Sequence, residues 1–522
     1  MSSKSAGIHW VVLCKLWAAI SGIVAVAVTN GKNVRCGSGW VAPIDGLKPI
    51  VGASGGVNAN DRAIVGLVMG AHAMVHTYEL SIPILVSVWL VEFDTISVLS
   101  ATFPVNAATL GVVVSAGYAL FGLGALLAGV LADAYGSRPL IALCLFGMGG
   151  SFLLLGLAPG VVVIALALVC WGAAASVYHP SGLALISKGV HERGSAFAYH
   201  GMAGNLGIAL GPLATTVVLL AFDWRTVVGL LAIPALIAGL FALRADIDET
   251  AAVGAAKGGA GEQVADGGER ERSEHEPRRS AGRSDDGTAD DGAADDDPTE
   301  DDGGTTTDGI ESFGEFFDRS KALFGGVFVL VFGVAMLSGL YYRGVLTFLP
   351  EILSEFPAFR PVEFAGSELQ PGRYFYAGLL MVGVLGQYVG GRLTDRVRPA
   401  AGIAGGYGAL AVLAVLFLPV ARVGVVPLLV VGAALGFFLF FVQPLYQAAI
   451  AEFSPPEARG VSYGYTYLGV FGIGALGGTI AGAILTAFSP PVLFATLAGF
   501  GVLAALLGVA VVVRTGGSLT TA

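Results

Sequence analysis

The sequence predicts an all-α membrane protein with twelve transmembrane helices arranged as two six-helix, pseudo-symmetric halves. The 522 residues are 55% hydrophobic and only 13% charged, whereas a soluble domain carries about 25% charged residues. Apolar runs long enough to cross a bilayer as helices recur along the chain. A short polar motif occurs once in each half of the sequence and indicates an internal duplication.

Charged and turn-forming residues divide the apolar sequence into twelve spans. Six precede an acidic segment in the middle of the chain, at 62–88, 107–130, 138–157, 160–187, 195–221 and 225–244. Six follow it, at 322–350, 373–393, 400–420, 424–450, 461–487 and 490–513. Many of the 77 glycines lie inside these spans, where small residues let membrane helices approach closely.

The repeated motif separates one apolar run from the next in both halves. Its first copy, GVLADAYGSR, occupies 129–138, and its second copy, GRLTDR, occupies 391–396. Asp and Arg are costly in hydrocarbon, so each copy marks a tight loop at the water interface. Other landmarks repeat in the same order at nearly the same offset, which favours a parallel duplication. They are Tyr78-Glu79 with Tyr342-Arg343, His179-Pro180 with Gln443-Pro444, Arg193-Gly194 with Arg459-Gly460, and Gly211 with Gly477.

The first copy resembles the loop between helices 2 and 3 of the major facilitator superfamily, which has the pattern G-x-L-a-D-r-x-G-r-r. Six positions match, namely Gly129, Leu131, Ala132, Asp133, Gly136 and Arg138. Ala134 and Ser137 depart from the pattern, so only one basic partner for Asp133 lies within this copy. The resemblance runs from residue 61 to 514 and implies the major facilitator fold. It implies a gating role for Gly129, Asp133, Gly136, Arg138, Gly391, Asp395 and Arg396.

A narrower resemblance lies in the middle of the first half. The stretch 177–213 is similar to the fosmidomycin-resistance branch of that superfamily. Within it, GIALGP at 207–212 resembles the span 5 motif of family antiporters, although Thr215 stands where a further glycine is usual. The branch and the motif imply an exporter that exchanges its substrate for a proton.

The charged connections predict the orientation. One side carries Arg138, Lys188, Arg193, Arg244, Arg392, Arg396, Arg398, Arg459 and Arg514, whereas the other carries Arg225, Arg360, Arg373 and Arg422. Excess Lys and Arg mark the cytoplasmic side. We therefore expect a multi-pass protein of the cell membrane whose twelve-helix body has both termini in the cytoplasm.

These observations divide the chain into a body and three further segments. The halves are 61–244 and 322–514, and a short tail occupies 515–522. The linker 245–321 should be a disordered cytoplasmic segment, because its acidic part has almost no large apolar residues. Residues 246–308 hold 20 acidic and 6 basic residues, so this segment carries a net charge of −14 and the rest of the chain +4, against −10 for the whole chain. Such acidity suits a halophilic source or a regulatory tail.

The two ends of the linker region and the start of the chain need separate interpretations. Phe313, Phe316 and Phe317 predict a short amphipathic helix lying on the inner membrane face before span 7. Residues 1–60 include an apolar piece interrupted by Lys15, followed by a Gly-rich coil. This extension is expected to be either a misassigned start, with Val57 as the natural one, or an extra helix on or across the membrane.

Ionisable residues inside the spans are the candidate transport site. His72, His76 and Glu79 are spaced i, i+4 and i+7, which puts them on one face of span 1. Buried ionisable groups in membranes face a bundle interior or a cavity, so this face predicts a substrate or proton site, or else a structural hydrogen-bond network. Histidines at i and i+4 would also suit zinc, but the sequence implies no third ligand and we expect no metal site.

Repeat symmetry adds candidates from other spans. Arg343 occupies the position equivalent to Glu79, and in the family fold spans 1 and 7 face each other, so the two charges could meet. Its alternative role is to bind a carbonyl or reach the interface. His179 and Gln443 form the next pair, each before a proline that frees a carbonyl and often kinks the helix. His200 in span 5 could equally be a core histidine.

The function predicted from the sequence is secondary transport of a small molecule by alternating access, with proton-coupled efflux favoured. The alternatives are a proton- or ion-coupled uptake symporter for an organic anion and a non-transporting membrane sensor. No phosphate-binding loop, catalytic constellation or cofactor motif is evident, so an enzyme, a cofactor and a nucleic-acid partner are not expected. The expected partners are a small-molecule substrate, H⁺ as the coupling ion, and the lipid bilayer.

Overall fold

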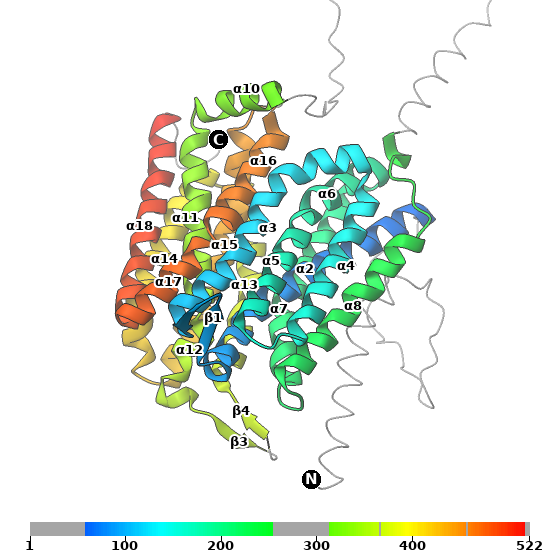
Figure 1. Ribbon diagram of the computed structural model, residues 1–522. Helices are drawn as coiled ribbons and strands as arrows, with labels where there is room; N and C mark the ends of the chain where they lie inside the picture. Colours follow the sequence, from blue (N-terminus) through cyan, green and yellow to red (C-terminus); the bar gives the residue numbers. More distant parts are fainter. Residues whose placement is uncertain (1–57, 254–312, 365–366, 456–457, 517–522) are drawn as a thin grey trace, which may run out of the picture.

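The computed structural model describes residues 58–253, 313–364, 367–455 and 458–516, and it forms two helical bundles lying side by side (Figure 1). The linker segment 254–312 and the extension before residue 58 lie outside the described residues. The first bundle, coloured blue to green, ends before that linker. The second bundle, coloured green to red, follows it.

The first bundle contains the six spans that the sequence predicts. Its helices are α2 (Ala59–Glu92), α3 (Ala107–Tyr135), α4 (Ser137–Gly156), α5 (Val161–Ser176), α6 (Tyr178–Gly189), α7 (Arg193–Val218) and α8 (Trp224–Arg244). The helices α5 and α6 are one span that is interrupted at Val177, two residues before His179 of the His179-Pro180 pair. Proline at this position removes a backbone donor and disfavours an uninterrupted helix.

The second bundle repeats the arrangement with more interruptions. It contains α10 (Phe313–Phe324), α11 (Phe328–Leu346), α12 (Leu349–Ser354), a 3-10 turn (Pro357–Phe359), α13 (Pro371–Leu393), α14 (Pro399–Ala421), α15 (Val425–Glu452), α16 (Arg459–Tyr467), η3 (Leu468–Ile473), α17 (Leu476–Ala487) and α18 (Pro490–Arg514). Eleven spans in the described residues are long and apolar enough to cross a membrane. The helix α13, with 23 residues, occupies the remaining position and completes the twelve predicted helices.

Local side chains set where several of these helices begin. Asn58 accepts a hydrogen bond from Asp61 N, and Asp223 accepts from the first backbone N–H groups of α8. Asn106 and Thr109 form a reciprocal capping box at the start of α3. The second bundle instead uses proline at the first turn, as in α13 and α18. By contrast, α15 continues through Pro444 without a break.

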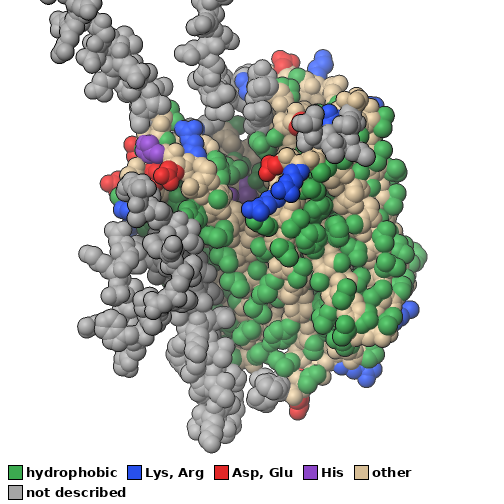
Figure 2. Space-filling model, turned by 180° about the vertical axis from the view of Figure 1, so that it is seen from behind, with side chains coloured by type: hydrophobic (Ala, Val, Ile, Leu, Met, Phe, Trp, Pro, Cys, Tyr) green, Lys and Arg blue, Asp and Glu red, His purple; other side chains and the backbone are tan. Residues whose placement is uncertain are grey.

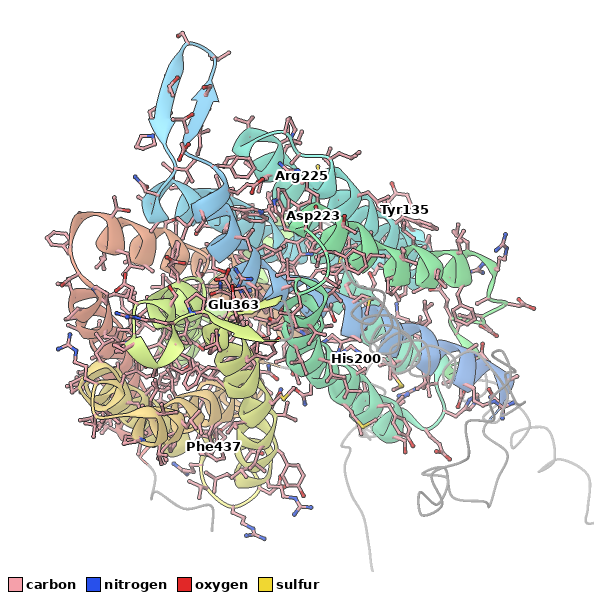
Figure 3. All side chains as sticks on the ribbon, turned by 90° about the horizontal axis from the view of Figure 1, so that it is seen from below. Tyr135, His200, Asp223, Arg225, Glu363 and Phe437 are labelled. Carbon is pink, nitrogen blue, oxygen red and sulfur yellow. The ribbon has the colours of Figure 1, made fainter. Side chains whose placement is uncertain are left out.

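Two small β-hairpins depart from the all-α prediction and define one face of the molecule. Strand β1 (Thr95–Val98) pairs with β2 (Ala101–Pro104), and β3 (Val362–Phe364) pairs with β4 (Ser367–Leu369), both antiparallel. Figure 3 views this hairpin face, with β1 and β2 projecting beyond the helices and Glu363 on the second hairpin. We call the opposite side, which carries α10, the α10 face.

The interface between the halves depends on glycine. Helix α3 packs along α16, η3 and α17, while α7 packs on α13. A Cβ on Gly122 would stand 2.0 Å from the backbone nitrogen of Gly472, and one on Gly482 would stand 2.1 Å from the Ala107 carbonyl oxygen. The π-turn η3 closes with a hydrogen bond from Gly474 N to Gly469 O, 2.9 Å. Backbone therefore lies directly on backbone along this seam.

Hydrogen bonds between the halves gather on the hairpin side. The Arg373 Nε donates to Ser87 Oγ at 3.3 Å, and Tyr376 OH donates to Leu80 O at 3.4 Å. Ala108 N donates to Thr486 Oγ1 at 2.9 Å. Figure 2 shows the surface hollowed between the halves toward the α10 face, with charged side chains around the hollow and a histidine visible inside it. The halves are thus joined at the hairpin face and apart at the α10 face.

The chain directly after α8 folds back on the first half, which corrects the predicted start of the disordered linker at 245. The Glu249 carboxylate accepts hydrogen bonds from Ser137 N at 2.7 Å and Arg138 N at 3.1 Å, at the start of α4. Asn60 likewise bonds to Asp248 O at 3.0 Å. A carboxylate at a helix N-terminus is stabilised by unpaired N–H groups there. At the linker's other end, the amphipathic helix predicted around Phe313 is confirmed as α10.

Substituting Gly122 by Ala should destabilise the protein by about 1–3 kcal/mol, because overpacking a close-packed contact costs this much. The added methyl group would meet the backbone of η3. The measurement is the thermal unfolding midpoint of the purified protein in detergent. Gly150→Ala is the matched control, since a Cβ at Gly150 has no atom within 4 Å. Equal midpoints for the two variants would contradict the close approach.

Candidate functional site

Ionisable side chains from both halves meet in the interior. His72, His76 and Glu79 lie on α2 and form the single face that their spacing predicts. Arg343 comes from α11 in the other half. Glu79 and Arg343 are 1% and 2% exposed, so the charges of both are removed from solvent.

The Glu79–Arg343 ion pair connects the two halves. An Arg343 terminal nitrogen donates to Glu79 Oε1, and the guanidinium carbon lies 3.5 Å from the centre of the Tyr118 ring. The Tyr118 hydroxyl donates to the backbone carbonyl of Glu79 at 2.6 Å. Tyr118 therefore supports both partners, through a cation–π contact with one and a hydrogen bond to the other. The pairing of opposite charges at matched repeat positions, which the sequence suggested, is present in the structure.

A chain of histidines extends from this ion pair. His76 Nδ1 lies 2.6 Å from the second carboxylate oxygen of Glu79, and His76 Nε2 lies 3.1 Å from His72 Nε2. At the far end, His72 Nδ1 lies 2.7 Å from the backbone oxygen of His200. The His72 and His200 rings stack with centroids 3.9 Å apart. The histidine in span 5, which sequence reasoning could not distinguish from a core residue, is thus part of the cluster.

The partners at the two ends of this chain determine which ring nitrogens must donate. A carbonyl only accepts, so His72 Nδ1 must donate to His200 O, and the ionised Glu79 carboxylate likewise requires a donor on His76 Nδ1. Two neutral rings in these tautomers would place two Nε2 lone pairs face to face at 3.1 Å. The contact becomes favourable when a cation lies between them. One extra proton on Glu79–His76–His72, or a metal ion bound by both rings, would satisfy it.

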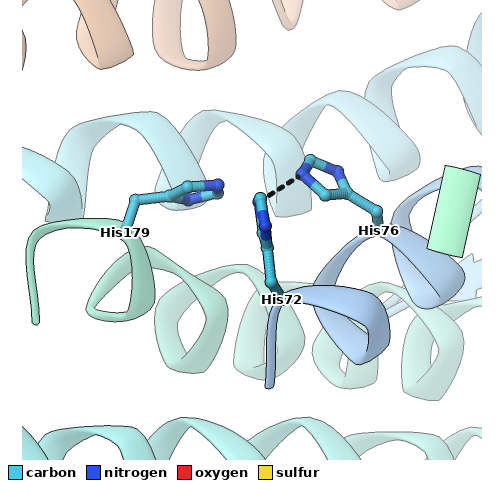
Figure 4. A group of neighbouring side chains, drawn as sticks. All are labelled: His72, His76 and His179. Carbon is cyan, nitrogen blue, oxygen red and sulfur yellow. Dashed lines mark hydrogen bonds between the residues drawn. The ribbon is translucent and has the colours of Figure 1, made fainter. Parts of the chain in front are cut away.

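His179 completes the cluster from α6. Its ring lies edge-on to His72 with centroids 5.2 Å apart, and Figure 4 shows it directed toward His72 and His76. One ring nitrogen from each of these three histidines lies within 4.8 Å of the other two. The His179 Nδ1 is buried and has no hydrogen-bond partner among the described residues. The third potential metal ligand, which the sequence did not supply, therefore comes from the break before α6.

Several contributors to this site were missed at the sequence level. Tyr118 contacts both members of the ion pair. Three further aromatic residues, Phe121, Tyr467 and Phe471, surround His179, with the Tyr467 ring centroid 5.0 Å away. Aromatic residues are frequent in apolar spans, so these positions carried no distinctive signal. Gln443, predicted as the partner of His179 by repeat symmetry, is half-buried on α15 and is not part of the histidine chain.

The predicted gating residues lie at the α10 face. Gly136 alone connects α3 to α4, with φ 84°, a left-handed conformation that glycine adopts without strain. Arg138 donates to the α8 carbonyl oxygens of Ala242 at 2.7 Å and Leu243 at 2.5 Å, so its side chain contacts its own half. The other members lie in α3 or at the end of α13. They are Gly129 and Asp133 in α3, Gly391 in α13, and the exposed pair Asp395 and Arg396 just after it.

Comparison with known sequences decides the family. A sequence profile described as Major Facilitator Superfamily matches residues 53–469 and 366–519, which together cover most of the chain. The chain belongs to the Major Facilitator Superfamily. It is accordingly a multi-pass membrane protein of a transporter family rather than a member of an enzyme family. The narrower fosmidomycin-resistance branch is not identified by these matches.

One sequence relative matches a fifth of the chain, and three solved structures show the same fold. A puromycin resistance protein of Streptomyces alboniger is 38% identical over 108 residues, which is 20% of this chain and 22% of that protein. The structure of the nucleoside transporter NupG aligns with a TM-score of 0.57 at 14% identity, covering 86% of this chain and 99% of that one. A D-xylose–proton symporter aligns with a TM-score of 0.54 at 15% identity, covering 85% and 96%. A bacterial homologue of the human lysosomal transporter Spinster gives 0.52 at 14%, covering 86% and 93%.

Neutralising either member of the central ion pair of this superfamily protein should destabilise it by about 3–5 kcal/mol, because the remaining buried charge loses its partner. Glu79→Gln and Arg343→Gln are the single variants, and combining them should recover much of the loss. The coupling energy from a double-mutant cycle of unfolding midpoints is the measurement.

The exposed pair of Glu92 and Arg225, 2.9 Å apart at the hairpin face, provides the control. Neutralising Glu92 should cost no more than about 1 kcal/mol, since solvent screens such pairs. Strict additivity of Glu79→Gln and Arg343→Gln would refute the ion-pair interpretation.

Proposed function

We propose that the protein is a secondary transporter that exports a small molecule in exchange for protons by alternating access. The observation that carries this proposal is the buried ion pair between Glu79 of the first half and Arg343 of the second, connected to a chain of hydrogen-bonded histidines. Motion of one half against the other changes this contact, so the charge on Glu79 and the relation of the halves are linked.

The coupling step follows from the cost of an unpaired charge. If Glu79 takes up a proton from His76, Arg343 loses its counter-charge in a buried environment, where an isolated charge is very costly. The contact with Tyr118 then stabilises Arg343 only in part. Two changes would remove this cost. Arg343 could pair with a different anionic partner, or the halves could move so that Arg343 is exposed. Proton movement along 3 side chains of α2 can thereby drive a conformational change.

Other groups around the chain shape its response to pH. Arg343 on α11, His179 on α6 and His200 on α7 each face it and oppose the accumulation of further positive charge. Tyr118 on α3 and Tyr178 on α6 are neutral hydrogen-bonding neighbours, and Tyr178 OH lies 3.2 Å from His200 Nδ1. We therefore propose that transport exchanges one proton at a time at this site.

One resemblance in the sequence and one relative support the export direction. The stretch 177–213 is similar to the fosmidomycin-resistance branch, to which we assign the protein. One relative is a puromycin resistance protein, although the match spans about a fifth of its length.

For the uptake alternative, the buried Arg343 Nε, which has no hydrogen-bond partner among the described atoms, offers a donor for an organic anion. The basic α10 face is assigned to the cytoplasm, so the hollow opens inward.

Compounds that raise the unfolding midpoint of the purified protein should be tested as substrates in proteoliposomes. Export by antiport predicts that an acidic lumen drives the compound inward as protons leave, whereas symport predicts the opposite direction. Glu79→Gln should reduce pH-driven flux by roughly tenfold or more, equivalent to about 1.4 kcal/mol of barrier. Glu92→Gln at the hairpin face should retain it. Flux that is indifferent to the pH gradient in the wild type would contradict proton coupling.

We further propose that Asp133 and Asp395 control gating at the α10 face. Their motifs lie where the halves are apart, which supports a role in contacts that form when that face closes. Asp133→Asn and Asp395→Asn should lower turnover while leaving substrate affinity unchanged, with the larger effect at Asp133. Initial transport rates and substrate-binding constants, both measured in proteoliposomes, distinguish an effect on turnover from an effect on affinity. Reduced affinity at normal turnover would assign these residues to substrate binding instead.

A further inference from the structure

Three histidines from two separated helices present nitrogen atoms to one another inside the first half. His72 and His76 are one helical turn apart on α2, and His179 approaches from α6 (Figure 4). We propose that these residues form a binding site for a divalent transition-metal cation of the zinc class, with one ring nitrogen from each as a ligand.

The spacing of the nitrogen atoms suits tetrahedral coordination. A zinc–nitrogen bond is about 2.0–2.1 Å, so two ligands of a tetrahedral site lie about 3.3–3.4 Å apart. His72 Nε2 and His76 Nε2 are 3.1 Å apart, close to this value. All three ligand atoms lie within 4.8 Å of one another. A shift of about 1.4 Å or less, within reach of a rotation of the His179 side chain, would therefore complete the set.

The opposite ring nitrogens already have the partners that metal-bound histidines usually have. His76 Nδ1 contacts the Glu79 carboxylate at 2.6 Å, and His72 Nδ1 contacts the His200 carbonyl at 2.7 Å. Such carboxylate and carbonyl contacts hold the ring and its tautomer so that Nε2 is directed at the metal. Both Nε2 atoms consequently face the same point.

His179 supplies a further, independent indication of a ligand. The side chain is 6% exposed, and its Nδ1 has no hydrogen-bond partner among the described residues. Leaving a buried polar nitrogen unpaired costs about 1–3 kcal/mol, which binding by a cation or a water would offset. The aromatic rings of Phe121 and Tyr467 pack beside the His179 ring, with centroids 5.7 Å and 5.0 Å away.

The donor set selects the class of cation. Imidazole nitrogen suits Zn²⁺, Co²⁺, Ni²⁺ and Cu²⁺, whereas Mg²⁺ and Ca²⁺ prefer oxygen ligands. Three protein ligands leave a fourth position for water, as in exchangeable rather than purely structural zinc sites. The cation takes the place between His72 and His76 that an extra proton otherwise occupies. Metal would thus oppose proton coupling, a consequence that rests on the proposed function, whereas the binding itself does not.

Binding is tested on the full-length, untagged protein in detergent, first with Zn²⁺ by calorimetry and then with Co²⁺ by its visible absorption. The wild type should bind one ion per chain, and Co²⁺ should show the intense bands of a four-coordinate, nitrogen-rich site. Loss of one ligand should weaken binding by more than about a hundredfold, since changes in outer contacts alone cost about 10–100-fold. His179→Gln tests this for the ligand from α6.

Two histidine variants serve as matched controls. His191 lies at the α10 face, bonded to Asp61, and His191→Gln should bind like the wild type. His200→Phe keeps the stacked ring and the backbone carbonyl that holds His72, so it should also retain binding. Each variant is compared with the wild type by gel filtration and unfolding midpoint, so that misfolding is recognised.

The outcomes decide the proposal without reference to transport. Absence of Zn²⁺ and Co²⁺ binding to folded wild-type protein would overturn it. So would a folded His179→Gln protein that binds as tightly as the wild type, or a His200→Phe protein that loses binding to the same degree. Transport without metal binding would refute the site and leave the proposed function intact. Metal binding by a protein that shows no pH-driven flux in its metal-free form would support the site and refute the proposed function.

Discussion

The buried ion pair between Glu79 and Arg343 is the constraint on which the arrangement of the two halves depends. Removing two charges from water costs several kcal/mol for each ion, and their attraction repays this only with good geometry and further hydrogen bonds. Tyr118 and His76 supply those additional contacts. Since one charge belongs to each half, neither bundle can place its own charge favourably alone. The pair therefore favours a particular docking of the halves, although buried pairs contribute little net stability.

The histidine chain extends this constraint through the first half. The His200 carbonyl and the Glu79 carboxylate set the donors at the two ends of the chain, and the central contact between the Nε2 atoms of His72 and His76 then needs a cation between them. In surroundings of low polarity, such bonds are strong and an unmatched one is costly. The protonation state and tautomer of one ring consequently determine which protonation states and tautomers are favourable for the neighbouring rings. A small cation at this place has an effect well beyond the atoms that it contacts.

The sequence predicted the features that periodicity and duplication determine. Twelve spans and the shared face of His72, His76 and Glu79 followed from hydropathy and helix geometry. The nearness of Arg343 followed from the repeat offset together with the family fold that the sequence resembles. The position of His179 did not, because it depends on the interruption at Val177 and on the rotation of α6, neither of which a single sequence reveals. The contact of Glu249 with the start of α4 was not predicted, because Glu249 stands among the many acidic residues of the linker. The short hairpins lack the length that separates strands from loops.

The π-turn η3 determines how the aromatic residues beside His179 relate to the glycines of α17. A π-turn takes more residues per revolution than an α-helix, and such turns often mark an inserted residue. It sets Tyr467 and Phe471 in a stack, with centroids 5.9 Å apart, while Gly477 still meets α11. The two parts of this span thus have different angular phases. Deleting one residue there would rotate the two parts of the span relative to each other. Only one part could then keep its contacts, so the number of residues at this point is as constrained as their identity.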